Sequence, residues 1–210
     1  MIKVLIADDH PVVRRGLKTI LRDAPEITAE DEASDGLEVM GLIRKEEYDV
    51  LLLDLSMPNL DGLEAISRIK AEKPELSILV LSMNPEEVFG MRALKLGASG
   101  YLSKDSAPEQ LITAIRRVAA GKIFVSQTLG EMLALNVSKG SPQLPHEMLS
   151  EREYQVMIMI AKGKSLKQIA IELSLSVKTI STHRAHILRK MNLENNAHIV
   201  TYSLHNKLLS

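Results

Sequence analysis

Four short apolar runs in the first half of the chain each end in residues that can take part in metal or phosphate chemistry. The runs begin at Val4, Val50, Ile78 and Gly100, and they end in Asp8-Asp9, Asp54, Ser82 and Lys104. In an open parallel sheet the carboxyl ends of the strands meet at one edge, and ligands bind there. The sequence therefore predicts that an acidic cluster, a hydroxyl group and an amine converge on one site.

Stretches with helical spacing of apolar residues separate these runs. They are expected at about residues 11–23, 35–46, 62–72, 85–97 and 108–120. Short strands alternating with helices of this length predict an α/β fold. Its centre is a doubly wound parallel sheet of five strands, covered by helices on both faces.

Charge divides the chain into two unequal parts, although the net charge is only −1. Residues 1–124 contain 16 Lys and Arg against 21 Asp and Glu, whereas residues 125–210 contain 10 against 6. This asymmetry favours two domains, one of which meets an anionic partner, although chance variation in solvated faces is the alternative.

Two absences bear on the class of protein. The chain has no cysteine, which excludes disulfides and thiolate metal sites. No apolar run approaches the ~20 residues of a membrane span, and the first residues enter a strand without the layout of a signal peptide. We therefore expect a cytoplasmic protein with no membrane partner.

A polar stretch over residues 136–146, with Gly140 and two prolines, is typical of a linker. Beyond it the apolar period becomes helical, with no strand signal. We expect one domain over 1–124, a linker over 125–145 that includes a short helix at about 126–135, and an all-α domain of four helices over 146–210.

The second domain carries the pattern of a helix-turn-helix. Ser150 with Glu153, and Ser165 with Gln168, have the spacing of capping boxes that begin helices. A helix at about 166–173 and a longer one at about 177–191 flank a tight turn, and the longer helix has a polar, basic surface. A last helix, about 196–208, carries a stripe of Ala197, Val200, Leu204 and Leu208, which is either core or a dimer face.

The acidic cluster suits phosphoryl transfer. Asp8, Asp9 and Asp54 repel one another unless a cation is present, and oxygen ligands of high charge suit Mg²⁺. With the cation bound, Asp54 can act as a carboxylate nucleophile that accepts a phosphoryl group. Lys104 can neutralise one phosphoryl oxygen, and the Ser82 hydroxyl can donate to another.

The residues Asp8-Asp9, the segment from Asp54 to Gly62, Ser82 and Lys104 resemble the receiver domain of a two-component response regulator. The stretch from Leu149 to about Leu209 resembles the LuxR-type DNA-binding domain, and the two together resemble the NarL/FixJ class. The resemblance implies a flavodoxin-like receiver with Asp54 as phosphoacceptor, phosphorylated by a sensor histidine kinase. It implies Mg²⁺ held by Asp8, Asp9, Asp54 and the main-chain carbonyl of Ser56.

The resemblance also implies a homodimer that binds double-stranded promoter DNA, and a switch in which Ser82 and Tyr101 reorient together on phosphorylation. The expected DNA-contacting residues are Ser176, Lys178, Thr179, Ser181, Thr182, Ala185, His186, Arg189 and Lys190. Within this set, Lys178, Thr179, Arg189 and Lys190 are expected at phosphates, while Ser181, Thr182 and Ala185 are expected at bases. Asp105 departs from the family pattern, because many receivers have proline there.

Other functions remain as alternatives. An aspartyl phosphohydrolase would need a second aspartate two residues after Asp54, where this chain has Ser56. A nucleotide or flavin carrier would need an uncharged phosphate loop, whereas Asp8-Asp9-His10 is acidic. His183 and His186 lie three apart on one helix without a third ligand at a recognisable spacing. A DNA-binding regulator that acts independently of phosphorylation is the nearest alternative. In neither case do we expect an enzyme, because a receiver promotes only its own phosphorylation and dephosphorylation.

Overall fold

The computed structural model describes residues 1–57, 62–83, 85–139, 144–206 and 208–209. The chain divides into two compact units, Met1–Ser141 and Pro142–Ser210, each with its own apolar core. Within the described ranges, no helix combines the length and the apolar character that crossing a membrane requires.

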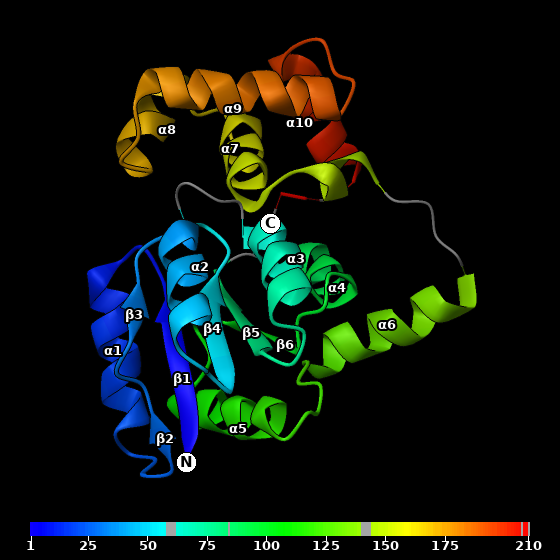
Figure 1. The fold of residues 1–210 in the computed structure, drawn as a ribbon. Coiled ribbons are helices and arrows are strands. Elements are labelled where there is room, and N and C mark those ends of the chain that lie inside the picture. Colours follow the sequence, from blue (N-terminus) through cyan, green and yellow to red (C-terminus); the bar gives the residue numbers. More distant parts are fainter. Residues whose placement is uncertain (58–61, 84, 140–143, 207, 210) are drawn as a thin grey trace. The chain divides into compact units, whose positions relative to one another are not determined.

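The first unit is built on a parallel sheet (Figure 1). Its strands are β1 (Ile2–Ala7), β2 (Ile27–Thr28), β3 (Glu32–Ala33), β4 (Val50–Asp54), β5 (Ser77–Ser82) and β6 (Gly100–Ser103). The order is β2-β1-β4-β5-β6, and β3 pairs with the end of β1. The doubly wound sheet is thus confirmed, with its second position filled by two short strands instead of one.

Helices cover both faces of this sheet (Figure 1). They are α1 (Pro11–Leu21), α2 (Gly36–Lys45), α3 (Gly62–Glu72), α4 (Glu86–Lys95) and α5 (Pro108–Ala119). Alternate strand residues, such as Val4 and Ile6 in β1 and Leu79 and Leu81 in β5, share one buried cluster with Leu111 of α5 and other residues of α1 and α5. Because strand side chains alternate between faces, the intervening residues of each strand face the other helices.

A sixth helix, α6 (Gln127–Lys139), packs against α4 within the same unit. Leu129 is fully buried, and a Cβ at Gly90 would lie only 2.6 Å from its Cδ2 atom. The Ser126 hydroxyl donates to the Glu86 carboxylate at 2.5 Å. The first compact unit therefore extends beyond residue 124, where the charge pattern places a domain boundary, and it includes the helix expected in the linker.

The second unit is helical, with a 3₁₀ turn η1 (Pro145–Met148) followed by α7 (Glu151–Ala161), α8 (Leu166–Glu172), α9 (Val177–Lys190) and α10 (Asn196–His205). Both predicted capping boxes are present, at Ser150 and at Ser165. Ser174 lies in the left-handed region, with φ 53°, in the turn between α8 and α9. The structure confirms the helix-turn-helix arrangement of α8 and α9.

Helix α10 buries a different face from the one that its apolar stripe suggests. Ile199 and Ser203 are fully buried, whereas Ala197 and Leu204 are exposed. Of the predicted stripe, Val200 and Leu208 are half-buried, so only Ala197 and Leu204 lie at the surface of the unit, and the core is formed by Ile199 and Ser203 instead.

Candidate functional site

An acidic cluster lies at the carboxyl ends of β1, β4 and β6. Asp8 directly follows β1 and Asp54 ends β4, and the register that pairs Ala7 with Leu53 sets these two positions side by side. Both aspartates are buried, at 1% and 2% exposed. Lys104 Nζ lies 2.7 Å from Asp8 Oδ2 and 2.8 Å from Asp54 Oδ2, so one ammonium group neutralises part of both charges.

Burial and charge act in opposition on these groups. Burial raises the pKa of Asp54 above its ordinary value, although Lys104 partly offsets the effect. Burial alone would lower the pKa of Lys104, but the charges and hydrogen bonds of Asp54 and Asp8 outweigh it and raise that pKa. The lysine is therefore held protonated, while the aspartate carries a charge that its surroundings solvate poorly.

Asp9 and His10 complete the cluster. The His10 N–H donates to Asp8 Oδ1 at 2.7 Å. Its ring Nδ1 lies 2.6 Å from Asp9 Oδ1 and 3.4 Å from Asp8 Oδ1. One ligand atom from each of Asp8, Asp9, His10 and Asp54 lies within 4.8 Å of the others. The sequence prediction named the three aspartates and missed His10, whose position directly after the Asp pair was the available signal.

The donor set fits a divalent cation. Asp9 Oδ1 and Asp54 Oδ2 are buried, with His10 Nδ1 at 2.6 Å from the first and Lys104 Nζ at 2.8 Å from the second. Three carboxylates gathered beside one ammonium group leave an excess of negative charge that a bound cation offsets. Mg²⁺ favours such oxygen ligands.

The remaining predicted residues lie at adjacent strand ends. Ser82 is fully buried at the end of β5, and its carbonyl accepts the Lys104 N–H at 2.9 Å. Tyr101 is 1% exposed in β6. The Ser56 N–H donates to Asp54 Oδ1 at 3.3 Å, which orients the carboxylate. The rest of the motif between Asp54 and Gly62 includes residues 58–61, which lie outside the described residues.

Asp105, at the position where many receivers have proline, forms a contact that proline could not form. Its N–H donates to Ser103 Oγ at 3.2 Å. Because proline has no N–H, this turn after β6 is closed by a hydrogen bond that the commoner residue would remove.

In the second unit, one exposed face of α9 collects five of the predicted DNA-contacting residues. These are Lys178, Ser181, Thr182, Ala185 and Arg189, which all lie at the surface. Their spacing places them on one side of the helix, since residues three and four apart are neighbours on a helix surface. At its start, Ser176 Oγ accepts the Thr179 N–H at 3.0 Å and lies 2.8 Å from the Thr179 hydroxyl. These two side chains therefore cap the helix.

Lys190 and His186 face a different direction. Lys190 Nζ donates to Glu153 Oε2 of α7 at 2.6 Å, and His186 Nδ1 lies 3.4 Å from Glu153 Oε1. Burial raises the pKa of Glu153, but Lys190, the Ser150 N–H and His186 outweigh burial and lower it. His183 is also half-buried, and burial lowers its pKa. Both Lys190 and His186 are thus engaged with α7 in this structure.

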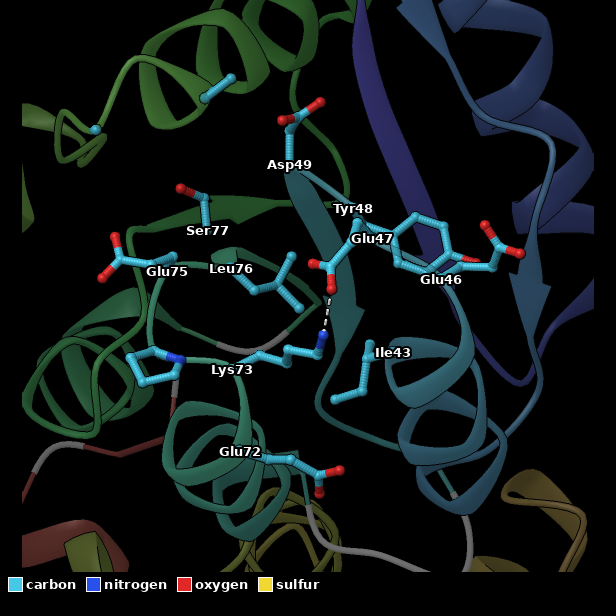
Figure 2. Close-up of a pocket in the computed structure, with 13 residues that line it drawn as sticks. Ile43, Glu46, Glu47, Tyr48, Asp49, Glu72, Lys73, Glu75, Leu76 and Ser77 are labelled. Atoms are coloured by element: carbon cyan, nitrogen blue, oxygen red, sulfur yellow. Dashed lines mark hydrogen bonds and ion pairs between the residues drawn. The ribbon is translucent and has the colours of Figure 1, made fainter.

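A separate pocket of about 540 Å³ lies at the opposite edge of the sheet, around the residues that precede β4 and β5 (Figure 2). Figure 2 shows Lys73 paired with Glu47 across it, at 2.5 Å. Tyr48 at its wall donates to Asp31 at 2.7 Å. None of the residues predicted from sequence to form a site lines this pocket.

Comparison with known proteins defines the class. Residues 4–116 match the response regulator receiver domain, and residues 147–203 match the bacterial regulatory proteins of the luxR family. The chain belongs to the two-component response regulators of the NarL/FixJ class, which are phosphorylation-controlled transcription regulators that bind DNA.

Relatives match along the whole chain. Response regulator UvrY of Escherichia coli K12 is 34% identical over 209 residues, covering 99% of this chain and 96% of UvrY. Oxygen regulatory protein NreC of Staphylococcus epidermidis ATCC 12228 is 41% identical over 215 residues, covering 99% of both chains. The structure of RcsB from Salmonella enterica serovar Typhimurium, bound to promoter rprA with the phosphomimetic BeF3⁻, is similar with a TM-score of 0.59 and 31% identity, over 96% of this chain and 98% of RcsB.

Proposed function

We propose that Asp54 accepts a phosphoryl group from a sensor histidine kinase and that the phosphorylated chain binds promoter DNA as a homodimer. The observation that supports this most directly is the bridging of Asp8 and Asp54 by Lys104, from three separate strand ends. A nucleophilic carboxylate, an acidic cation site and a fixed ammonium group are the components that phosphoryl transfer to a carboxylate needs.

The cation site consists of Asp8, Asp9, Asp54 and the main-chain carbonyl of Ser56. Mg²⁺ bound there supplies positive charge that offsets the negative charge of the incoming phosphoryl oxygens. Asp54, held by the Ser56 N–H, then attacks phosphorus, while the bond to the donor nitrogen breaks and its electron pair stays on the donor. Lys104 exchanges its pairing with Asp54 for a phosphoryl oxygen, and the Ser82 hydroxyl donates to another.

The phosphoryl group then biases a switch between two packings of Ser82 and Tyr101. Tyr101 is buried in β6, where it pairs with Val80 of β5, the strand that ends in Ser82. When Ser82 turns toward the phosphoryl oxygen, the buried Tyr101 side chain changes its packing with it. The phosphoryl group shifts the equilibrium between the two packings only as far as it interacts more favourably with one packing than with the other.

DNA binding uses the exposed face of α9. Lys178 and Arg189 contact phosphates. Between them lie three short side chains that can contact base edges and a thymine methyl group, namely Ser181, Thr182 and Ala185. A two-fold dimer would place two such helices at half-sites about one helical turn apart. The exposed Ala197 and Leu204 of α10 support a dimer face there. A kinase donor and a promoter target together imply action in the cytoplasm.

Intact mass spectrometry after incubation with Mg²⁺ and a small phosphodonor tests this function. Wild type is expected to gain one phosphoryl group, and Asp54→Ala is expected to gain none. Asp49→Ala is the matched control, because Asp49 lies just before the same strand, at its opposite end, and should behave as wild type. Equal modification of wild type and Asp54→Ala would refute the assignment, and DNA binding unchanged by phosphorylation would favour the phosphorylation-independent regulator.

A further inference from the structure

We infer that Arg14 is a positioning residue for the cation site, because its guanidinium fixes the peptide that joins Asp8 to Asp9. Glu32, at the start of β3, holds that guanidinium in place. The inference rests on the proposed function in one respect, namely that the two aspartates bind a divalent cation. It assigns a role to two residues that lie outside the set of cation ligands.

One main-chain oxygen carries the inference. Arg14 Nη1 donates to the carbonyl oxygen of Asp8 at 2.6 Å. That oxygen belongs to the peptide between Asp8 and Asp9, and a peptide unit is planar, so a hydrogen bond to its oxygen restrains the orientation of the whole unit. The two carboxylates leave the chain on either side of this peptide. Its orientation therefore sets the direction of one carboxylate relative to the other.

Other parts of the same turn are held by different contacts. The Asp8 N–H donates to the carbonyl oxygen of Ala33 in β3 at 3.1 Å. The His10 N–H donates to Asp8 Oδ1 at 2.7 Å. These bonds restrain the preceding peptide and the Asp8 side chain, whereas the Arg14 bond restrains the peptide between the two aspartates.

Glu32 anchors the arginine from the side of β3. Arg14 Nε donates to Glu32 Oε2 at 2.6 Å, and Lys18 Nζ lies 2.7 Å from Glu32 Oε1. Hydrogen bonds from Lys18 and Arg14 hold the pKa of Glu32 below its ordinary value of 4.5, so the carboxylate is charged at neutral pH. The Arg14 side chain is only 15% exposed, which limits its freedom to leave this position.

The geometry of arginine suits this double contact. The guanidinium is planar and its N–H groups donate in fixed directions, so binding Glu32 through Nε aims Nη1 at the Asp8 carbonyl. The charge of Arg14 acts in the opposite sense, because a positive group beside a cation site repels the cation. Positioning and electrostatics therefore predict opposite effects on cation affinity when Arg14 is removed.

Calorimetric titration of the full chain with Mg²⁺ tests the inference. Arg14→Ala is expected to raise the Mg²⁺ dissociation constant about tenfold, as the loss of a group that orients metal ligands commonly does. Loss of a neighbouring positive charge alone would lower that constant. Arg15→Ala is the matched control, because Arg15 is the adjacent, exposed arginine of α1, and its removal should not weaken Mg²⁺ binding.

A second variant keeps the charge and changes the geometry. Arg14→Lys retains a positive charge, but one ammonium on a flexible stem does not reproduce the fixed fork of a guanidinium. Arg14→Lys is therefore also expected to bind Mg²⁺ more weakly than wild type. This variant provides the test if Arg14→Ala does not fold.

The phosphorylation rate with a small phosphodonor, measured over a Mg²⁺ series, separates positioning from a general loss of structure. Arg14→Ala should need more Mg²⁺ for its half-maximal rate and reach about the wild-type rate at saturation. The reason is that the nucleophile Asp54 is oriented by the Ser56 N–H and not by Arg14.

A double variant tests whether Glu32 acts through Arg14. Glu32→Gln should weaken Mg²⁺ binding in the wild-type background and add nothing in the background of Arg14→Ala, because residues that act as one unit are not additive. Further weakening in the double variant would show that Glu32 does not act through Arg14.

Asp9→Asn separates failure of the inference from failure of the proposed function. If Asp9→Asn leaves Mg²⁺ binding unchanged, the proposed cation site itself fails. If Asp9→Asn weakens binding while Arg14→Ala and Arg14→Lys bind Mg²⁺ as tightly as wild type or more tightly, the cation site stands and the inference is overturned.

Discussion

Lys190 Nζ lies 2.6 Å from Glu153 Oε2, which ties the last turn of α9 to the first turn of α7. Glu153 also accepts the Ser150 N–H at 2.9 Å, in the capping box that begins α7. Helix α9 is thereby anchored to the start of α7 through the buried carboxylate of Glu153. Lys190 thus helps to hold α9 in position as well as adding a positive charge to it.

Lys190→Ala is expected to destabilise the helical unit by about 1–3 kcal/mol, because a buried carboxylate loses its main partner. Glu153 has a lowered pKa, so its stabilisation is present above the ordinary value of 4.5 and is lost as pH falls through the lowered pKa. The effect of Lys190→Ala should therefore shrink in acid. Urea unfolding followed by circular dichroism at neutral and acidic pH measures it. Arg189→Ala, at the exposed neighbour, should change stability by less than about 0.5 kcal/mol.

Lys178→Ala and Arg189→Ala are each expected to flatten the dependence of log affinity for DNA on log salt by about one unit. Both side chains are exposed on the face of α9 that carries Ser181 and Thr182, so each can meet a phosphate. Thr182→Ala should instead relax sequence preference with a smaller change of slope. Fluorescence anisotropy over a salt series measures these slopes, and an unchanged slope for Arg189→Ala would show that this face does not meet the phosphates.

Asp54→Asn is expected to stabilise the first unit at neutral pH, since it removes a poorly solvated buried charge while Lys104 keeps its pairing with Asp8. The pKa of Asp54 is higher in the folded state than its ordinary value of 3.8, so its charge destabilises the folded state at pH values above the raised pKa. Below pH 3.8 the group is protonated in both states and the effect is absent. The gain should therefore vanish in acid. Calorimetry of both proteins across pH follows it, and a lower melting temperature for the variant at neutral pH would contradict the expectation.

Lys104→Ala is expected to accept phosphate more slowly and to lose most of the rise in DNA affinity that follows phosphorylation. The ammonium that pairs with Asp54 is the group that can draw a phosphoryl oxygen toward β6. Affinity is compared after mass spectrometry has established equal phosphorylated fractions of variant and wild type. A full rise in affinity in the phosphorylated variant would separate Lys104 from the switch.

The convergence of Asp8, Asp54 and Lys104 could be predicted from sequence because each follows a recognisable strand, and parallel strands end at one edge. The helices could also be predicted to within a few residues, because the spacing of apolar residues marks their extent. Helix α3, for example, begins and ends where that spacing does. These features depend on local pattern and on topology, which a single sequence expresses directly.

Other features depend on which side of an element meets a neighbour. Spacing alone does not show that Lys190 faces Glu153 while Arg189 faces solvent, because both lie on the polar part of α9. The same limit applies to Leu129, whose partner Gly90 lies far away in sequence. In α10 the buried Ser203 breaks the apolar pattern, so the stripe that includes Leu204 looked like the inner face. Tertiary packing decides these cases.

The strand register has a consequence for the order in which the two units refold. Val4 pairs with Val50 in the sheet, so forming the central ladder of β1 requires the closure of a long loop. The helical unit is held by helices that follow one another closely, and two of them begin with self-contained capping boxes. Folding slows as contacts become more distant in sequence. After dilution from denaturant, we therefore expect the C-terminal unit to regain its structure first and the N-terminal sheet to set the time at which the whole chain is native.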